Sequence, residues 1–283
     1  MTNPFDAEAL IGDLTITLDI DVLIGRYPGK DHPGDGHTWT DDAEDDDAGD
    51  DDPGADQRDG SGPHRGGDAD QVLALLARHR ITAGAVASLR AALFDVRSGN
   101  DEVLALRNHS DVVPVGGVDL RDPVRAVAET ERLAAAGVRA IRLFCEEQGI
   151  EPDFPSVRHV ARAATELGLV ILSGGDVRRF WRPYAGLGAT VVFLDTHFYH
   201  LGDFLVVAAD EPGFHTSTRL LNSPDGLEIV AERVGVRRLL FGSRTPYYET
   251  LVPRLRLATS GLDAVQRAAV AGGNARALLG VAR

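Results

Sequence analysis

Residues 239–246 read Leu-Leu-Phe-Gly-Ser-Arg-Thr-Pro, and residues 273–280 read Gly-Asn-Ala-Arg-Ala-Leu-Leu-Gly. The apolar run at 238–241 predicts a short buried strand that stops at a glycine. Arg244 follows this strand within the same string. A guanidinium, which stays charged in proteins, is therefore expected where the last strand of the chain ends.

The rest of the chain alternates short apolar runs with helical patterns. We expect strands at 14–20, 83–89, 111–118, 138–144, 169–172, 189–195, 213–217 and 238–241. We expect helices at 70–77, 98–104, 123–136, 155–167 and 223–234. Ser98 is the expected cap of the second of these helices, Pro123 suits a first helical position, and Gly137 ends the helix that Pro123 begins.

Eight strand–helix alternations favour an α/β protein built as a parallel (β/α)8 barrel, the TIM barrel. Such a barrel typically needs about 250 residues. The 283 residues of the chain therefore suit one domain that spans 1–283. From the pattern alone, a doubly wound open sheet remains the alternative.

The strings at 239–246 and 273–280 resemble the tail of the amidohydrolase-related family, in its decarboxylase-like branch. In that family the last barrel strand ends in Phe-Gly-Ser-Asp, and a Gly-Asn-Ala turn opens the closing helix. The resemblance extends over roughly the whole chain outside one acidic segment and is strongest in the last fifty residues. It implies a (β/α)8 barrel and makes the open sheet a poor alternative.

The resemblance also implies metal ligands at strand ends, and this chain carries other residues there. Related proteins place a His-x-His pair after strand one, where this chain has Asp19 and Asp21. These share the one-residue spacing, so the two carboxylates can face one point. Where relatives carry an Asp that acts as metal ligand and proton shuttle, the last strand has Arg244.

Two further ligand positions differ as well. Ser173 stands where relatives end strand five in a bridging His. After strand six, relatives carry His-x-Gly-Gly, and the preferred register places Asp195 at the ligand position. A shift of two residues would place His197 there instead.

Two physical interpretations of these residues compete. Asp19, Asp21 and Asp195 could form an all-oxygen site for one hard divalent cation such as Mg²⁺ or Mn²⁺. We favour the other interpretation, in which Arg244 replaces the metal and compensates the carboxylates with a permanent cation and five donors. An Arg244 that turns outward to solvent is the third arrangement. The favoured interpretation has no metal cofactor, and metal-dependent hydrolysis then lacks both its ion and its base.

Active sites of such barrels lie at the carboxyl ends of the strands. The candidate pocket or substrate-binding residues are therefore Asp19, Asp21, Arg142, Ser173, Asp195, His197 and Arg244. Asp195 and His197 are the candidates for an acid–base group, and Arg142 or Arg244 would hold a substrate carboxylate.

The charge of the chain is concentrated in one segment. The net charge is −14, and the stretch from Lys30 to Asp68 holds fourteen acidic and three basic residues. Its composition predicts a disordered acidic insertion at about 30–67. The remainder is nearly neutral and has no basic stripe, so we expect no nucleic-acid partner.

Composition also bears on the compartment. The chain has one cysteine, Cys145, and no run of about 18 apolar residues, so neither an intrachain disulfide nor a transmembrane helix is expected. Residues 1–10 show no signal-peptide pattern. We expect a cytoplasmic protein with a small-molecule ligand and no membrane partner, and a homo-oligomer stays open.

Three functions fit these observations. The favoured one is a divergent amidohydrolase-related protein that binds a small molecule and has lost the usual metal-dependent hydrolysis. The second is an active hydrolase or decarboxylase of small carboxylate or amide substrates with a rearranged site. The third is an interaction protein in which the acidic insertion is the working part. The fold cannot choose between them.

Overall fold

The computed structural model describes residues 7–27 and 66–281. The acidic insertion expected at about 30–67 lies outside the described residues, except for Gly66 and Gly67. The expectation of disorder there stays a prediction from composition.

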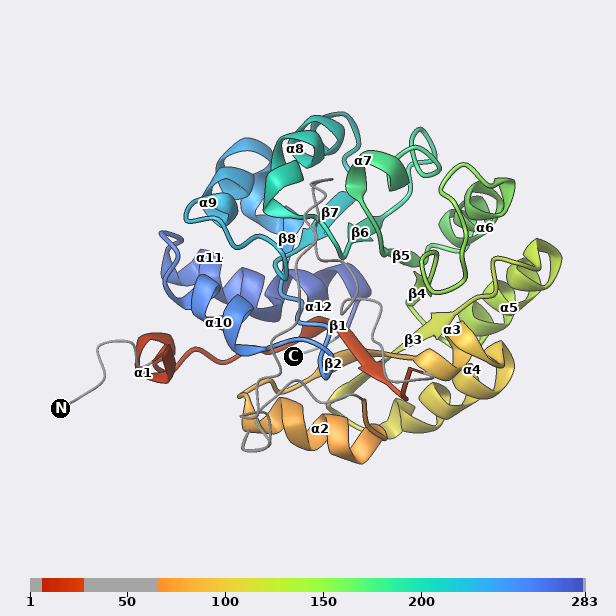
Figure 1. The fold of residues 1–283 in the computed structure, drawn as a ribbon, viewed down its shortest axis with the longest axis horizontal. Helices are drawn as coiled ribbons and strands as arrows, with labels where there is room; N and C mark the ends of the chain where they lie inside the picture. The colour runs from red at the N-terminus through yellow and green to blue at the C-terminus, as the bar shows by residue number, and fades with distance from the viewer. Residues whose placement is uncertain (1–6, 28–65, 282–283) are drawn as a thin grey trace, which may run out of the picture.

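Eight parallel strands form a nearly closed barrel with helices around it, which confirms the predicted (β/α)8 fold (Figure 1). The strands pair in chain order. They are β1 Asp19–Ile24, β2 Gly84–Ser88, β3 Val112–Gly117, β4 Ala140–Leu143, β5 Val170–Ser173, β6 Val191–Phe193, β7 Phe214–Ser217 and β8 Leu239–Leu240.

Backbone hydrogen bonds join the first strand to the last. Ile20 N donates to Phe241 O at 2.9 Å, and Leu23 N donates to Thr245 O at 2.9 Å. Val22 and Thr245 also form an isolated parallel bridge. The residues that follow β8 therefore run beside β1. This arrangement brings the segment that holds Arg244 next to the strand that holds Asp19 and Asp21.

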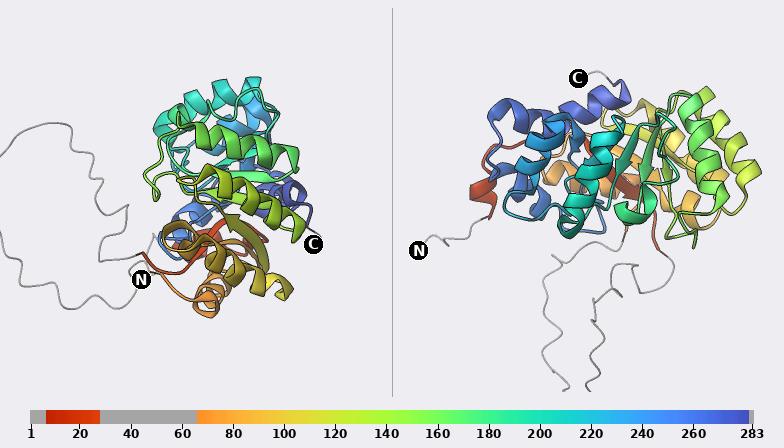
Figure 2. Two further views of the ribbon diagram at one scale, coloured as in Figure 1. Left: turned by 90° about the vertical axis from the view of Figure 1, so that its right-hand side faces the viewer. Right: turned by 90° about the horizontal axis from the view of Figure 1, so that it is seen from above.

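Helices surround the barrel, as Figure 2 shows from two further sides. They are α1 Ala7–Ile11, α2 Ala69–Arg78, α3 Leu89–Leu93, α4 Val96–Ala105, α5 Pro123–Ala135, α6 Pro155–Glu166, α7 Val177–Phe180, α8 Leu201–Asp210, α9 Gly226–Val230, α10 Leu251–Ala258, α11 Ala264–Ala268 and α12 Asn274–Leu279. In the described part of the chain, no helix has the length and apolar character needed to cross a membrane.

Local sequence signals explain where α5 begins and ends. The Asp122 carboxylate accepts a hydrogen bond from Arg125 N at 3.1 Å, and Pro123 occupies the first turn. Gly137 follows the helix with a φ of 87°, a conformation that favours glycine. The expected helix at 123–136 is confirmed to within one residue.

Three expected elements need correction. The first strand runs over 19–24 instead of 14–20, because Asp19 and Asp21 are buried within it and interrupt the apolar pattern. The helix expected from Ser98 begins at Val96, because the carboxylate of Asp95 caps it by accepting from Ser98 N at 2.6 Å. The helix expected at 223–234 begins at Gly226, and the helices α1, α3, α7, α8, α10 and α11 were not expected at all.

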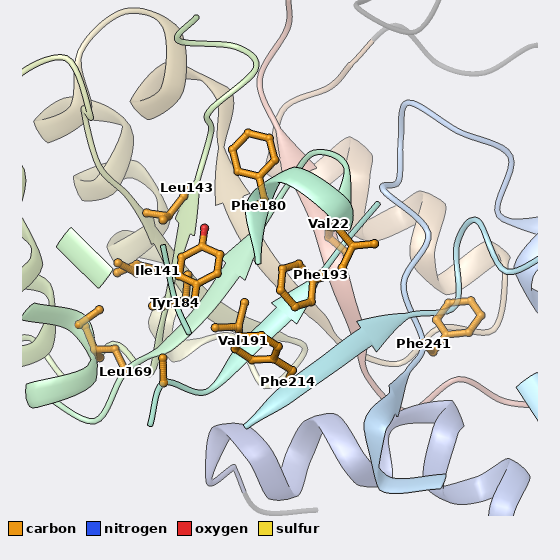
Figure 3. Packing of buried hydrophobic residues seen from close by; sticks show 14 of the residues in the cluster. Val22, Ile141, Leu143, Leu169, Phe180, Tyr184, Val191, Phe193, Phe214 and Phe241 are labelled. Atoms are coloured by element: carbon orange, nitrogen blue, oxygen red, sulfur yellow. The ribbon is translucent and has the colours of Figure 1, made fainter. Parts of the chain in front are cut away.

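Alternation along the strands sorts their side chains into two buried clusters. In β4, Ile141 and Leu143 join the cluster between the barrel and the helices, where Phe193 and Phe214 pack edge to face with centroids 5.1 Å apart (Figure 3). Ala140 belongs to the cluster that includes the barrel interior. Arg142 is two residues further along the same strand and shares the inward face of Ala140.

Candidate functional site

Asp21 accepts hydrogen bonds from two arginines inside the barrel. Its side chain is fully buried. The register between β1 and β2 shifts between Asp19 and Val22, and such an irregularity changes the direction in which the side chains of that stretch point. Arg142 from β4 donates to Oδ1, and Arg244 Nε donates to Oδ2 at 3.1 Å. Residues from β1, β4 and the end of β8 thus meet at one carboxylate.

Asp195, just beyond β6, is the second carboxylate of this group. Arg244 Nη2 lies 2.8 Å from Oδ1 and 2.9 Å from Oδ2. Arg219 forms a close ion pair with Oδ1, and Gly175 N donates to Oδ2 at 2.9 Å. Arg244 therefore bridges Asp21 and Asp195. We call Asp21, Arg142, Asp195, Arg219 and Arg244 the ion cluster.

Arg244 takes an unusual backbone conformation to reach this position. Its φ is 58°, in the left-handed region that costs a non-glycine residue about 1 kcal/mol or more. Its side chain is only 9% exposed and engages both aspartates. Such a conformation persists only when the surrounding contacts hold it, so the ion pairs fix the course of the chain after β8.

Arg219 belongs to the ion cluster, and the sequence reading did not single it out. It lies two residues beyond β7, and its Cζ sits 4.5 Å above the centroid of the Tyr248 ring. Its Nε is 4.0 Å from Asp21 Oδ2 and is a buried donor without a hydrogen-bond partner, as is the buried hydroxyl of Thr196. Arg219 follows a strand, as Arg244 does, and this position was the feature of the sequence that could have identified it.

The electrostatics of the ion cluster favour ionised aspartates. Burial alone would raise the pKa of Asp21, but Arg142, Arg244 and Arg219 together hold it below its usual value. Burial likewise opposes ionisation of Asp195, and Arg244 and Arg219 overcome it and lower that pKa. Three guanidiniums thus face two ionised carboxylates, which leaves an excess of positive charge.

Asp19 is buried but stands apart from these arginines. Ser243 Oγ donates to its Oδ2 at 2.5 Å, and the backbone N–H groups of Ser243 and Asp21 donate to its Oδ1 at 3.1 and 2.9 Å. Burial raises the pKa of Asp19 to about 7, although the hydrogen bond from Ser243 acts in the opposite direction. A chain of hydroxyls continues from Ser243 to Thr245 at 2.6 Å and from Thr245 to Thr250 at 2.9 Å.

Besides Asp19, the structure leaves two other candidate residues, Ser173 and His197, outside the ion cluster. Ser173 is buried and shares a 2.9 Å hydrogen bond with the hydroxyl of Tyr184, which belongs to the cluster under the helices. His197 lies in the segment after β6, where its ring stacks on Tyr199 at 4.8 Å and its Nδ1 accepts from Tyr199 N at 3.3 Å. Burial, together with His200 and Arg219, lowers the pKa of His197.

The donor atoms at the expected metal positions are already engaged. Both oxygens of Asp21 and of Asp195 accept from guanidiniums, and both oxygens of Asp19 accept from Ser243 or the backbone. Within residues 7–27 and 66–281, no three His, Cys, Asp or Glu side chains are grouped to hold a metal ion. The described residues therefore do not fit a metal, since a guanidinium occupies the space between the two carboxylates.

Comparison of the structure with solved structures identifies proteins of the same fold. IDCase from Metarhizium anisopliae is 16% identical, with 95% of this chain and 98% of that chain covered and a TM-score of 0.63. A 2-pyrone-4,6-dicarboxylic acid hydrolase, itself assigned only provisionally, from Pseudomonas putida is 17% identical, with 94% and 98% covered and a TM-score of 0.61. The 2,6-dihydroxybenzoate decarboxylase from Rhizobium is 14% identical, with 76% and 89% covered and a TM-score of 0.59.

The solved structures that share this fold include decarboxylases, a hydrolase and a protein described as an amidohydrolase. No protein-family model matches the sequence, and no curated protein matches it. At the low identities of the structural neighbours, the likeness establishes the fold. The structural neighbours therefore confirm, as a likeness of fold, the resemblance inferred from residues 239–246 and 273–280.

Proposed function

We propose that this chain is a divergent member of the amidohydrolase superfamily that binds a small organic anion and has lost metal-dependent hydrolysis. The observation that carries the proposal is the bridge that Arg244 makes between Asp21 and Asp195. A permanent cation there supplies the positive charge that a metal supplies in relatives, but it cannot coordinate and activate water.

The preference for an anionic ligand follows from the charge and the unused donor of the ion cluster. Three arginines face two ionised aspartates, and the buried Nε of Arg219 has no hydrogen-bond partner within the described chain. A ligand carboxylate would accept from such a donor, because charge-assisted hydrogen bonds to guanidinium are strong and geometrically specific. One structural neighbour is 2,6-dihydroxybenzoate decarboxylase in complex with 2,6-dihydroxybenzoate, a small ligand that carries a carboxylate.

Binding titrations test this function directly. Acetate and 2,6-dihydroxybenzoate would be titrated into the protein by calorimetry, with acetamide and 2,6-dihydroxybenzamide as uncharged controls. We expect at least one carboxylate to bind more tightly than its amide. Arg219→Met should weaken the binding of that carboxylate about tenfold or more, since a hydrogen bond to a charged group contributes roughly 1.5–3 kcal/mol. Equal binding of acids and amides, or binding of neither, would overturn the anion site.

A metal-independent hydrolase or decarboxylase is the second candidate function. The observation in its favour is Asp19, whose raised pKa of about 7 suits a group that exchanges a proton near neutrality. Asp195 suits that role less, because Arg244 and Arg219 hold it ionised. Turnover of 2,6-dihydroxybenzoate or 2-pyrone-4,6-dicarboxylate in the presence of chelator, abolished by Asp19→Asn, would favour this function over binding alone.

A further inference from the structure

A hydrogen bond joins the segments that follow β1 and β4, at the carboxyl ends of these two strands. The Tyr27 hydroxyl, three residues beyond β1, donates to Glu147 Oε1 at 3.3 Å. Glu147 lies in the segment after β4, and it is half-buried. Because β2 and β3 separate β1 from β4 in the sheet, this bond joins segments that follow two strands that are not neighbours.

The aromatic side of this bridge is held in place. The Tyr27 ring meets the Tyr247 ring edge-on, with centroids 5.0 Å apart and planes at 79°. The Tyr247 hydroxyl donates to Gly25 O at 2.7 Å. Edge-to-face aromatic pairs of this kind contribute beyond their buried area, so Tyr27 is positioned by the strand ends of both β1 and β8.

Tyr27 and Glu147 lie within electrostatic reach of the arginines. Burial and the Glu147 carboxylate raise the pKa of Tyr27, whereas Arg142 and Arg244 act in the opposite direction. Glu147 also strengthens the protonated state of Arg244, after Asp195 and Asp21. Four groups from β1, β4 and the end of β8 therefore share one electrostatic environment.

Glu147 is a third carboxylate whose charge acts on Arg244 of the ion cluster. Arg142, Arg219 and Arg244 make direct ion pairs only with Asp21 and Asp195 among the described residues. Glu147 stands farther from Arg244 than a direct ion pair, and among the described residues its carboxylate accepts a hydrogen bond from Tyr27. Its charge nevertheless acts on Arg244, after those of Asp195 and Asp21.

We propose that Glu147 is the resident counter-anion of the ion cluster, that Tyr27 positions it, and that the anionic group of the ligand competes with it. The inference rests on the proposed function, because it requires an anionic ligand. It assigns Glu147 as a residue that sets the affinity and the charge selectivity of the site. A like charge next to a binding position opposes an incoming anion, and its removal relieves that opposition.

Glu147→Gln tests the inference, with acetate as the probe and calorimetry or ligand-observed NMR as the measurement. We expect acetate to bind about tenfold more tightly than to the wild type, a change equivalent to about 1.4 kcal/mol. Acetamide affinity should stay unchanged, because an uncharged ligand does not compete with the carboxylate. The matched control is Glu146→Gln, which changes the net charge equally at the exposed neighbouring position.

Tyr27→Phe keeps the Glu147 charge but removes the hydrogen bond that positions it. We expect acetate affinity to rise about twofold to threefold in this variant, less than in Glu147→Gln, and it supplies the test if Glu147→Gln does not fold. Acetate binding that is equal in wild type, Tyr27→Phe and Glu147→Gln would overturn the role of Glu147 and leave the anion site standing. Absence of acetate binding in all of them, with Glu147→Gln folded, would overturn both proposals.

Discussion

Arg244 Nε donates to Asp21 Oδ2 at 3.1 Å across 223 positions of the sequence. The bond joins the end of the last strand to the first strand, beside the backbone bonds that Ile20 and Leu23 make to the same segment. The pair therefore belongs both to the closure of the barrel and to its candidate site. Changes at Arg244 should consequently affect stability as well as ligand binding.

The protein should purify without a stoichiometric transition metal. The reason is that guanidiniums engage both oxygens of Asp21 and of Asp195, and Asp19 is engaged by Ser243 and the backbone. Elemental analysis of dialysed protein is the measurement. Near one equivalent of zinc, manganese or iron that resists dialysis would contradict the prediction and would favour the hard-cation site.

The acidic insertion should be dispensable for folding. Its composition offers too little apolar surface to offset the entropy of ordering. Replacement of residues 35–65 by a short Gly/Ser linker should leave the Tm within a few degrees by thermal circular dichroism. Gly66 should be kept, because its φ is 106° and an added Cβ would lie 2.4 Å from Gly25 O. A large loss of helical signal would show that the segment packs on the barrel.

The barrel was predictable from the sequence because its signals are local. Apolar runs of β-branched residues, Pro123 at a helix start and Gly137 at a helix end each act within a few residues. The first strand was misplaced for a reason of the same kind. Asp19 and Asp21 look like exposed residues in the sequence. Their burial depends on distant groups, the arginines around Asp21 and Ser243 beside Asp19.

The ion cluster was predictable only in part. Strand-end position selected Asp21, Arg142, Asp195 and Arg244, which the structure brings together. The partners of each carboxylate depend on side-chain reach across the barrel, which no local pattern encodes. Arg219 was missed although it also follows a strand, and nothing local in the sequence shows that Asp19 pairs with Ser243 instead of an arginine.

Asp19 should make the stability of the fold depend on pH. Its folded-state pKa of about 7 lies above the ordinary value of 3.8, so the folded state holds a proton that the unfolded state releases. The contribution is fully present below about pH 4 and is lost as pH rises towards 7. Urea unfolding between pH 4.5 and 7.5 should therefore show wild type losing stability with rising pH relative to Asp19→Asn.

The comparison with Asp19→Asn isolates this group from others that titrate nearby. Burial lowers the pKa values of His197 and His215, so both contribute stability that grows as pH rises through their range. Asp21 and Asp195 have lowered pKa values and act below about pH 4. Parallel pH profiles for wild type and Asp19→Asn would show that Asp19 titrates normally.

Arg244→Met should leave two buried carboxylates without their cation and so lower the free energy of unfolding. Neutralising one of these carboxylates should restore part of that free energy. Breaking one side of a buried pair typically costs about 3–5 kcal/mol, whereas an exposed arginine would give under about 0.5 kcal/mol. Neutralising the partner removes the stranded charge, so Arg244→Met with Asp21→Asn or Asp195→Asn should be less damaging than the sum of the single changes, by about 0.5–3 kcal/mol. Asp19→Asn is the matched control, because Asp19 bonds to Ser243 and should combine additively with Arg244→Met. Urea-unfolding double-mutant cycles at constant salt, in conditions where unfolding is reversible, give these coupling energies. Additive cycles with Asp21 and Asp195 would mean that Arg244 does not hold the two carboxylates together in solution, and the argument for a cation in place of the metal would fail.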